Sequence, residues 1–256
     1  MFPAPETLVV LLAAFAAGLV DAIVGGGGLI QAPALFSFYP AVQPATLLGT
    51  SKFAGVFGTA SAAVRYSRRV GLPWALLGPL ALLVMLTAAL GAVVATRVPA
   101  QVFRPIVPAL LVVVTAYLLR HREIGVTHAP RVLAGGARAL AVALIAAIGF
   151  YDGFFGPGTG SFLMIVFVRL YGFDFLHAAG SARVLNVATN LAALGWFAAH
   201  DAVIWELGLA MAACNIAGAM AGTRLAFRGG NRFVRRAFIA IVVGLILRTS
   251  WTAFVR

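Results

Sequence analysis

Long, almost uncharged apolar stretches recur along the whole chain, separated by short polar segments. They cover residues 7–24, 44–64, 73–96, 106–119, 140–155, 175–199, 203–227 and 233–251. A helix needs about 20 mostly apolar residues to cross a bilayer, and most of these stretches come close to that length. The pattern therefore predicts an all-α integral membrane protein.

Two further apolar runs, residues 29–39 and 161–171, are too short to cross a bilayer alone. At 1.5 Å per residue, a helix of this length covers roughly half of a hydrocarbon core about 30 Å thick. Each run follows a glycine-rich break, so we expect each short helix to begin inside the membrane. Irregular backbone at that depth is tolerated only where protein or a water-filled cavity surrounds it. The breaks are therefore expected to line a cavity.

The second half of the chain repeats the first after a shift of 131 residues, without a gap. Matched Asp, Trp, Gly and cationic positions carry this argument, because apolar helices share Ala and Val by chance. The matched pairs include Gly18 and Gly149, Asp21 and Asp152, Gly25 and Gly156, Gly27 and Gly158, Gly49 and Gly180, Thr50 and Ser181, Lys52 and Arg183, and Trp74 and Trp205. We expect two repeats, residues 1–125 and 126–256, each a glycine-broken short helix pair plus three spanning helices.

Composition and charge support a membrane protein and specify its topology. Hydrophobic residues make up 62% of the chain and charged residues 10%, whereas a soluble domain is about 25% charged. The net charge of +12 does not indicate nucleic acid, because arginines gather in loops, as on the cytoplasmic side of membrane proteins. The clusters are Arg65, Arg68 and Arg69; Arg120, Arg122, Arg131 and Arg138; and Arg228, Arg232, Arg235 and Arg236. They occupy different loops in the two halves, which predicts inverted repeats with the N-terminus outside.

The glycine breaks are the first candidate for a binding site. Glycine lets a ligand approach the backbone closely, and the helix that follows offers unpaired N–H groups and a positive dipole end to an anion. Close helix packing is the alternative explanation, but recurrence before a short helix in both halves favours a transport site. The candidates are Gly25, Gly26, Gly27 and Gly28 in the first half and Gly156, Gly158, Gly160 and Ser161 in the second.

Lys52 and Arg183 are the second candidate, because they are cations deep within long apolar segments. A charge at the bilayer centre costs at least ~2.5 kcal/mol, so it tends to face a cavity or a partner. Together they could clamp an anion, with Thr50, Ser181 and Asn186 as polar neighbours. The alternative is that each side chain reaches the membrane interface from near a helix end.

Asp21 and Asp152 lie at the same spacing from the cation of their own half. They are the obvious counter-charges, and they are candidate proton carriers if transport is coupled to protons. Capping next to a glycine break is the alternative. Asn190, Thr59 and Asn215 are expected to line the same path.

No cofactor or metal is expected from sequence spacing. The four histidines are scattered near loops, and the single cysteine, Cys214, fits no metal motif. No nucleotide-binding motif or His-Glu-x-x-His occurs. Ser161 and His177 are the nearest nucleophile and base on adjacent segments, without a third member, so an enzyme is not expected.

The paired motifs resemble the sulfite exporter TauE/SafE family. The resemblance rests on residues 18–33 and 48–52 in the first half and residues 149–160 and 180–186 in the second. It implies a multi-pass transporter of the bacterial inner membrane, which exports sulfite, an organosulfonate or a related small organic anion. We expect alternating access, with an anion channel of the same architecture as the alternative. The expected partners are the anion and the lipid bilayer, not nucleic acid. The sequence does not decide whether the chain forms a homo-oligomer. Pro157 and Thr159 interrupt the second glycine motif, unlike the first.

Overall fold

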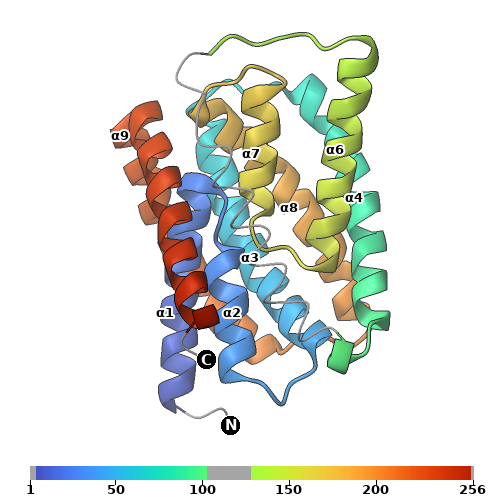
Figure 1. The fold of residues 1–256 in the computed structure, drawn as a ribbon, viewed down its shortest axis with the longest axis vertical. Coiled ribbons are helices and arrows are strands. Elements are labelled where there is room, and N and C mark those ends of the chain that lie inside the picture. Colours follow the sequence, from blue (N-terminus) through green and yellow to red (C-terminus); the bar gives the residue numbers. More distant parts are fainter. Residues whose placement is uncertain (1–3, 103–127, 255–256) are drawn as a thin grey trace.

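The computed structural model describes residues 4–102 and 128–254, and the regular structure of this part is entirely helical (Figure 1). The predicted span at residues 106–119 lies outside the described residues. The helices are α1 (Ala4–Val24), α2 (Gly28–Phe38), α3 (Pro44–Ser67), α4 (Trp74–Arg97), α6 (Gly135–Phe154), α7 (Thr159–Arg169), α8 (Phe175–Ala199) and α9 (Trp205–Phe254). The backbone of α9 leaves helical geometry at Gly230, whose φ of 63° separates two helical parts. The all-α fold class is confirmed.

The outer helices present apolar side chains outward, as a bilayer requires. On α4, Leu82, Leu86 and Leu90 are exposed and spaced by four residues, so they form one stripe along the helix. Among the described helices, α1, α4 and α6 combine the length and apolarity of a membrane span. The helices α3 and α8 are also long enough, at 24 and 25 residues. They are less apolar because they carry the polar side chains of the interior. The chain is a membrane protein.

Two helix hairpins enter the bundle from opposite ends and meet inside it (Figure 1). The hairpin of α1 and α2 opens at the lower end of the view, and that of α6 and α7 opens at the upper end. Their glycine breaks touch: the Ser161 N–H donates to Gly25 O at 3.1 Å, and the Ser161 hydroxyl donates to Val24 O at 2.8 Å. The irregular backbone of both breaks is therefore surrounded by protein.

The contact between the breaks explains why glycine occupies Gly25. Its φ of +80° is unfavourable for residues with a side chain, and an added Cβ would lie 2.3 Å from the Gly160 carbonyl carbon. Glycines elsewhere allow close helix packing, as where Gly218 of α9 meets the Phe15 carbonyl of α1.

Arginine is unevenly distributed between the two ends of the bundle. The end at which α3 and α7 finish and α6 begins holds Arg68, Arg138 and Arg169. The opposite end, at which α1 and α9 begin and α4 finishes, holds Glu6 and Glu206 in first turns and one arginine, Arg97, in the last turn of α4.

Candidate functional site

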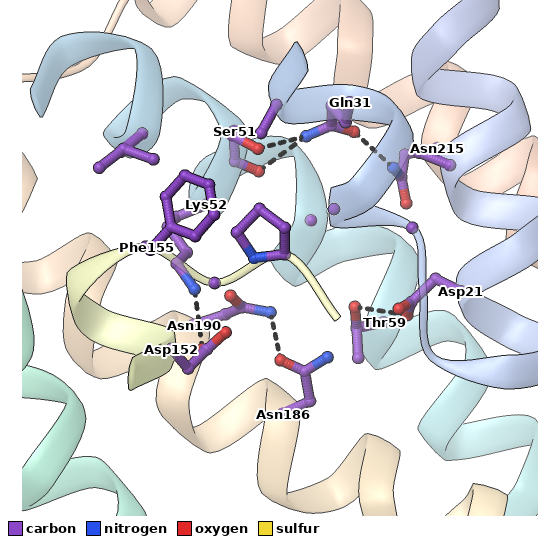
Figure 2. A pocket seen from close by; sticks show the side chains of 18 residues that line it. Asp21, Gln31, Ser51, Lys52, Thr59, Asp152, Phe155, Asn186, Asn190 and Asn215 are labelled. Carbon is purple, nitrogen blue, oxygen red and sulfur yellow. Dashed lines mark hydrogen bonds and ion pairs between the residues drawn. The ribbon is translucent and has the colours of Figure 1, made fainter. Parts of the chain in front are cut away.

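A cavity of about 60 Å³ lies beside the glycine breaks and is lined by charged, amide and apolar side chains (Figure 2). It is formed by α1, α2, α3, α8, α9 and the end of the α6–α7 hairpin. The lining residues are Ala17, Asp21, Gly27, Gly28, Gln31, Ala32, Leu48, Ser51, Lys52, Gly55, Thr59, Asp152, Phe155, Gly156, Pro157, Asn186, Asn190 and Asn215.

Lys52 is the cation in the wall of this cavity. Its ammonium nitrogen lies 2.8 Å from Asp152 Oδ2, and the two side chains are only 7% and 2% exposed. The ion pair joins α3 in the first half to α6 in the second. Gly156, with a φ of +98°, lies directly beside the ammonium, where an added Cβ would come within 2.7 Å of Nζ. A side chain at this position would displace Lys52.

Arg183 is also buried, at 1% exposure, but it does not line the cavity. Its guanidinium donates to the main-chain oxygens of Asp21 and Ala179 and to the sulfur of Met164. It also lies over the Tyr66 ring, 5.8 Å from the centroid. The cation of each half thus contacts the aspartate position of the other half, Lys52 through a carboxylate and Arg183 through a main-chain carbonyl. These contacts bring both matched pairs together, but only Lys52 faces the cavity.

Asp21 is held at the opposite side of the cavity from the ion pair (Figure 2). Its Oδ2 accepts a hydrogen bond from the Thr59 hydroxyl at 3.2 Å, and the Gly27 N–H also donates to its carboxylate. The cavity therefore contains two acidic side chains and one basic side chain.

Amide side chains fill the wall between the charges. The Gln31 amide donates to the Ser51 hydroxyl and main-chain oxygen at 2.9 and 3.0 Å, and its oxygen accepts from Asn215 at 2.9 Å. The Asn190 amide donates to Asn186 Oδ1 at 3.1 Å on the facing helix α8. These groups offer both donors and acceptors to a polar ligand.

Seven of the predicted site residues line the cavity. They are Asp21, Gly27, Gly28, Lys52, Asp152, Gly156 and Asn186. Thr59, Asn190 and Asn215, expected along the same path, line it as well. The cavity thus collects residues from both halves of the chain.

The other predicted residues lie outside the lining of the cavity, and several of them make structural contacts. They are Gly25, Gly26, Thr50, Gly158, Gly160, Ser161, Ser181 and Arg183. The Thr50 hydroxyl donates to Thr46 O and accepts from the Ile204 N–H. Gly158 caps α7 with a left-handed φ of 89°, and Gly25 and Gly160 pack against one another.

The two short helices differ at their N-termini. Gly28, the first residue of α2, lines the cavity. In the first turn of α7, the Ser161 N–H donates to Gly25 O and the Thr159 N–H donates to Gly156 O. The Ser161 donor therefore joins the two hairpins, whereas the Thr159 donor stays within its own hairpin. Anion binding at the two helix N-termini stays a prediction.

Sequence reasoning missed Gln31 and Ser51 as wall residues. Gln31 is 3% exposed within the otherwise apolar first turns of α2. The sequence did carry a signal for Gln31, which is an amide in a short apolar helix. A buried amide needs hydrogen-bond partners.

Ser161 and His177, the nucleophile and base considered for an enzyme, do not form a catalytic pair in this structure. The Ser161 hydroxyl donates to Val24 O between the glycine breaks. His177 Nδ1 lies 2.7 Å from Asp174 Oδ1 at the start of α8. The hydroxyl and the imidazole thus have separate partners.

A cavity with buried charges and amides, inside an all-helical membrane protein, is the kind of site that membrane transporters use. The profile of the family described as "Sulfite exporter TauE/SafE" matches residues 10–249, and the chain belongs to this family.

Curated relatives are described as membrane transporters as well. The chain is 39% identical over 240 residues to a "Probable membrane transporter protein ORF9" of Sinorhizobium sp, covering 93% of this chain and 89% of the relative. It is 34% identical over 238 residues to the "Probable membrane transporter protein YfcA" of Escherichia coli K12, covering 91% and 85%. A "Probable membrane transporter protein" of Haemophilus influenzae is 34% identical over 221 residues, covering 86% and 85%. No solved structure matches the chain significantly. All three relatives are described as probable membrane transporters.

Proposed function

We propose that this protein is a secondary transporter of the bacterial inner membrane that exports a small oxyanion, such as sulfite, an organosulfonate or a related organic anion. The observation that carries the proposal is the burial of Lys52 in a polar cavity inside the membrane domain. A lone ammonium at that depth is costly and is retained where it binds a charged partner or substrate.

The size of the cavity supports a small substrate. One water requires roughly 10–15 Å³ of such volume, so a cavity of about 60 Å³ has room for on the order of four waters. This suits a compact anion with a few oxygens better than a large metabolite.

The charge balance supports coupling to protons. Lys52 is already neutralised by Asp152, and Asp21 lies in the same cavity. A bare anion entering this site would meet a carboxylate competing for the same ammonium. Protonation of Asp152 would release Lys52 for the anion, so anion and proton would bind together. Asp152 and Asp21 are the proton carriers in this proposal.

The arrangement of the hairpins supports alternating access by inverted repeats. The two hairpins open at opposite ends of the bundle, and their breaks meet beside the cavity. Rocking of one half against the other would open the cavity to each side in turn. The arginine-rich end faces the cytoplasm in this topology, which leaves the N-terminus outside.

The test is a transport assay in proteoliposomes containing the purified protein. Radiolabelled sulfite, short sulfonates and carboxylates are offered with and without a pH gradient. We expect saturable uptake of at least one anion, stimulated by a proton gradient, with counterflow when unlabelled anion is trapped inside. Flux without counterflow and too fast for a carrier would instead identify an anion channel.

Lys52→Ala and Asp152→Asn separate anion binding from proton coupling in this assay. We expect Lys52→Ala to abolish transport and Asp152→Asn to remove the stimulation by the pH gradient. Wild-type transport by Lys52→Ala would overturn the proposed role of the cavity.

A further inference from the structure

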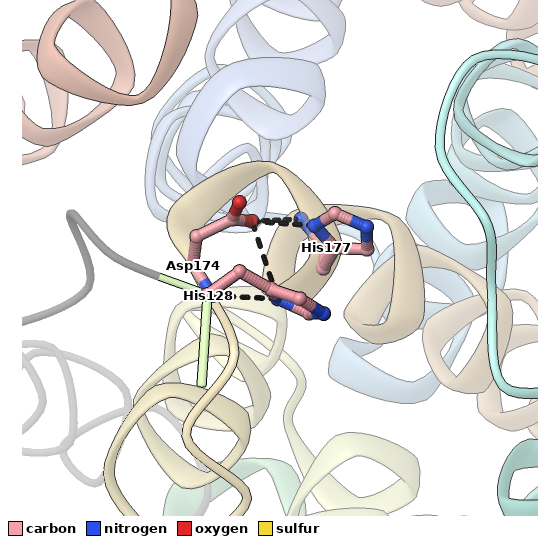
Figure 3. Close-up of side chains that lie close together, drawn as sticks. All are labelled: His128, Asp174 and His177. Carbon is pink, nitrogen blue, oxygen red and sulfur yellow. Dashed lines mark hydrogen bonds and ion pairs between the residues drawn. The ribbon is translucent and has the colours of Figure 1, made fainter. Parts of the chain in front are cut away.

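A second cluster of functional side chains lies at the arginine-rich end of the bundle, away from the cavity. His128, Asp174 and His177 place ligand atoms within 4.8 Å of one another (Figure 3). His128 lies 46 residues before Asp174 in the sequence, so no metal-ligand spacing predicts the group. The histidines that look scattered along the chain are therefore partly gathered by the fold.

The backbone positions of the three side chains are set by ordinary structural contacts. Asp174 is the N-cap of α8, and its carboxylate accepts from the His177 N–H at 2.8 Å. The segment that carries His128 pairs with the loop before α8 through hydrogen bonds from Ala129 N to Gly172 O and from Arg131 N to Tyr171 O, both 2.9 Å. The cluster is thus pre-assembled on two segments.

The candidate ligand nitrogens lie close to the Asp174 carboxylate. His177 Nδ1 lies 2.7 Å, and His128 Nδ1 lies 4.0 Å, from Asp174 Oδ1. A tetrahedral zinc site with bonds of about 2.0–2.2 Å places its ligand atoms roughly 3.3–3.5 Å apart. The observed distances bracket that value. The two imidazole rings are stacked with centroids 3.8 Å apart, so metal binding requires the side chains to rotate and the proton between His177 Nδ1 and Asp174 Oδ1 to be displaced.

His128 already has the tautomer that ligation requires. Its Nδ1 accepts a hydrogen bond from the Asp174 main-chain N–H at 3.3 Å, so this nitrogen carries a lone pair, which points toward that amide and would have to leave it to bind a metal ion.

We propose that His128, Asp174 and His177 form a binding site for a first-row divalent metal ion such as Zn²⁺. Two imidazoles and one carboxylate are a ligand set typical of this class of ion, with water in the fourth position. The side chains are 33%, 11% and 22% exposed for His128, Asp174 and His177, so an ion can reach them. The bound ion would connect the segment before α6 to the start of α8, the helix that carries Asn186 and Asn190.

The site is tested by metal binding to the purified full-length protein in detergent, after treatment with a chelator. Zn²⁺ is titrated in competition with a chromophoric indicator, and Co²⁺ replaces it to report ligand geometry by visible absorption. We expect one saturable site per chain. His128→Ala and His177→Ala should each weaken Zn²⁺ binding by about 10-fold or more and change the Co²⁺ spectrum.

His200→Ala is the matched control. His200 caps the other end of the same helix and lies against the Trp196 ring, with centroids 4.0 Å apart, but within the described part of the chain it pairs with no carboxylate. Its variant should bind Zn²⁺ as the wild type does. The proposal is overturned if the wild type shows no saturable site, or if His128→Ala and His177→Ala, folded by circular dichroism, bind Zn²⁺ unchanged. This outcome is independent of the transport assay.

Discussion

The ammonium of Lys52 and the carboxylate of Asp152 form a buried ion pair at 2.8 Å, which connects α3 to α6 across the middle of the protein. Each residue has a counterpart 131 positions away, Arg183 for Lys52 and Asp21 for Asp152. The counterparts meet differently, because Arg183 binds the main-chain oxygen of Asp21 and not its carboxylate. The site is therefore asymmetric although the sequence repeats.

Removing only one member of the ion pair is expected to destabilise the protein. Lys52→Ala leaves Asp152 as an uncompensated buried charge, which costs about 3–5 kcal/mol. The double variant Lys52→Ala with Asp152→Asn removes both charges and should recover most of this loss without recovering transport. Thermal unfolding in detergent measures the first effect, and uptake by proteoliposomes measures the second. Equal stability of the single and double variants would contradict the coupling of the two charges.

Lys52 is the single lysine of the chain, so its side chain can be followed by chemical labelling of amines. An amine-directed reagent, such as formaldehyde with a borohydride, should modify its side chain slowly because the cavity is buried. A transported anion that binds the ammonium should slow the reaction further, and intact-mass measurement would follow it. Labelling at the same rate with every candidate anion would argue against a direct contact between substrate and Lys52.

Gly25 is expected to tolerate no side chain. Gly25→Ala forces a Cβ into the Gly160 backbone and a positive φ, so it should cost ~2 kcal/mol or more and reduce folded yield. Gly195 of α8 is the matched control, because an added Cβ there meets nothing within 4 Å. Gly195→Ala should not destabilise the protein, because alanine is favoured over glycine inside a helix by about 0.5–1 kcal/mol. Fluorescence-detected size exclusion with a temperature series compares the two variants.

Gln31 is expected to hold the amide wall together. Gln31→Leu leaves the Asn215 amide and Ser51 without this partner, which costs about 1–3 kcal/mol and should weaken apparent substrate affinity. Ser37→Leu is the control on the same helix, since Ser37 is exposed. The comparison is made by thermal unfolding and by the concentration dependence of uptake. Identical behaviour of the two variants would show that the wall is not required.

Much of the helical architecture follows from local sequence signals. The apolar runs of residues 44–64 and 73–96 predict α3 and α4 to within a few residues at each end, because a bilayer span requires both length and apolarity. The short helices α2 and α7 were likewise predicted from their length and the glycines before them. The burial of Lys52 and Arg183 follows from the same patterns, since each lies inside a long apolar segment.

The site itself was only partly predictable. Glycine serves both ligand approach and close packing, so the sequence could not separate Gly28, which lines the cavity, from Gly25 and Gly160, which pack together. Matched positions likewise suggested equal roles for Lys52 and Arg183. The structure gives these residues different partners. The neighbouring side chains, and not the sequence repeat, decide where the charged end of a long side chain lies.

By itself, the sequence determined that the chain is an α-helical membrane protein with glycine breaks, buried cations and a family relationship, since these depend on local composition and on motifs. Only the tertiary structure decided that Lys52 meets Asp152 and that Gln31 joins the cavity wall. It also gathered His128, Asp174 and His177 into one cluster. These contacts join residues far apart in the chain, and their partners are set by how helices pack, which no local pattern specifies.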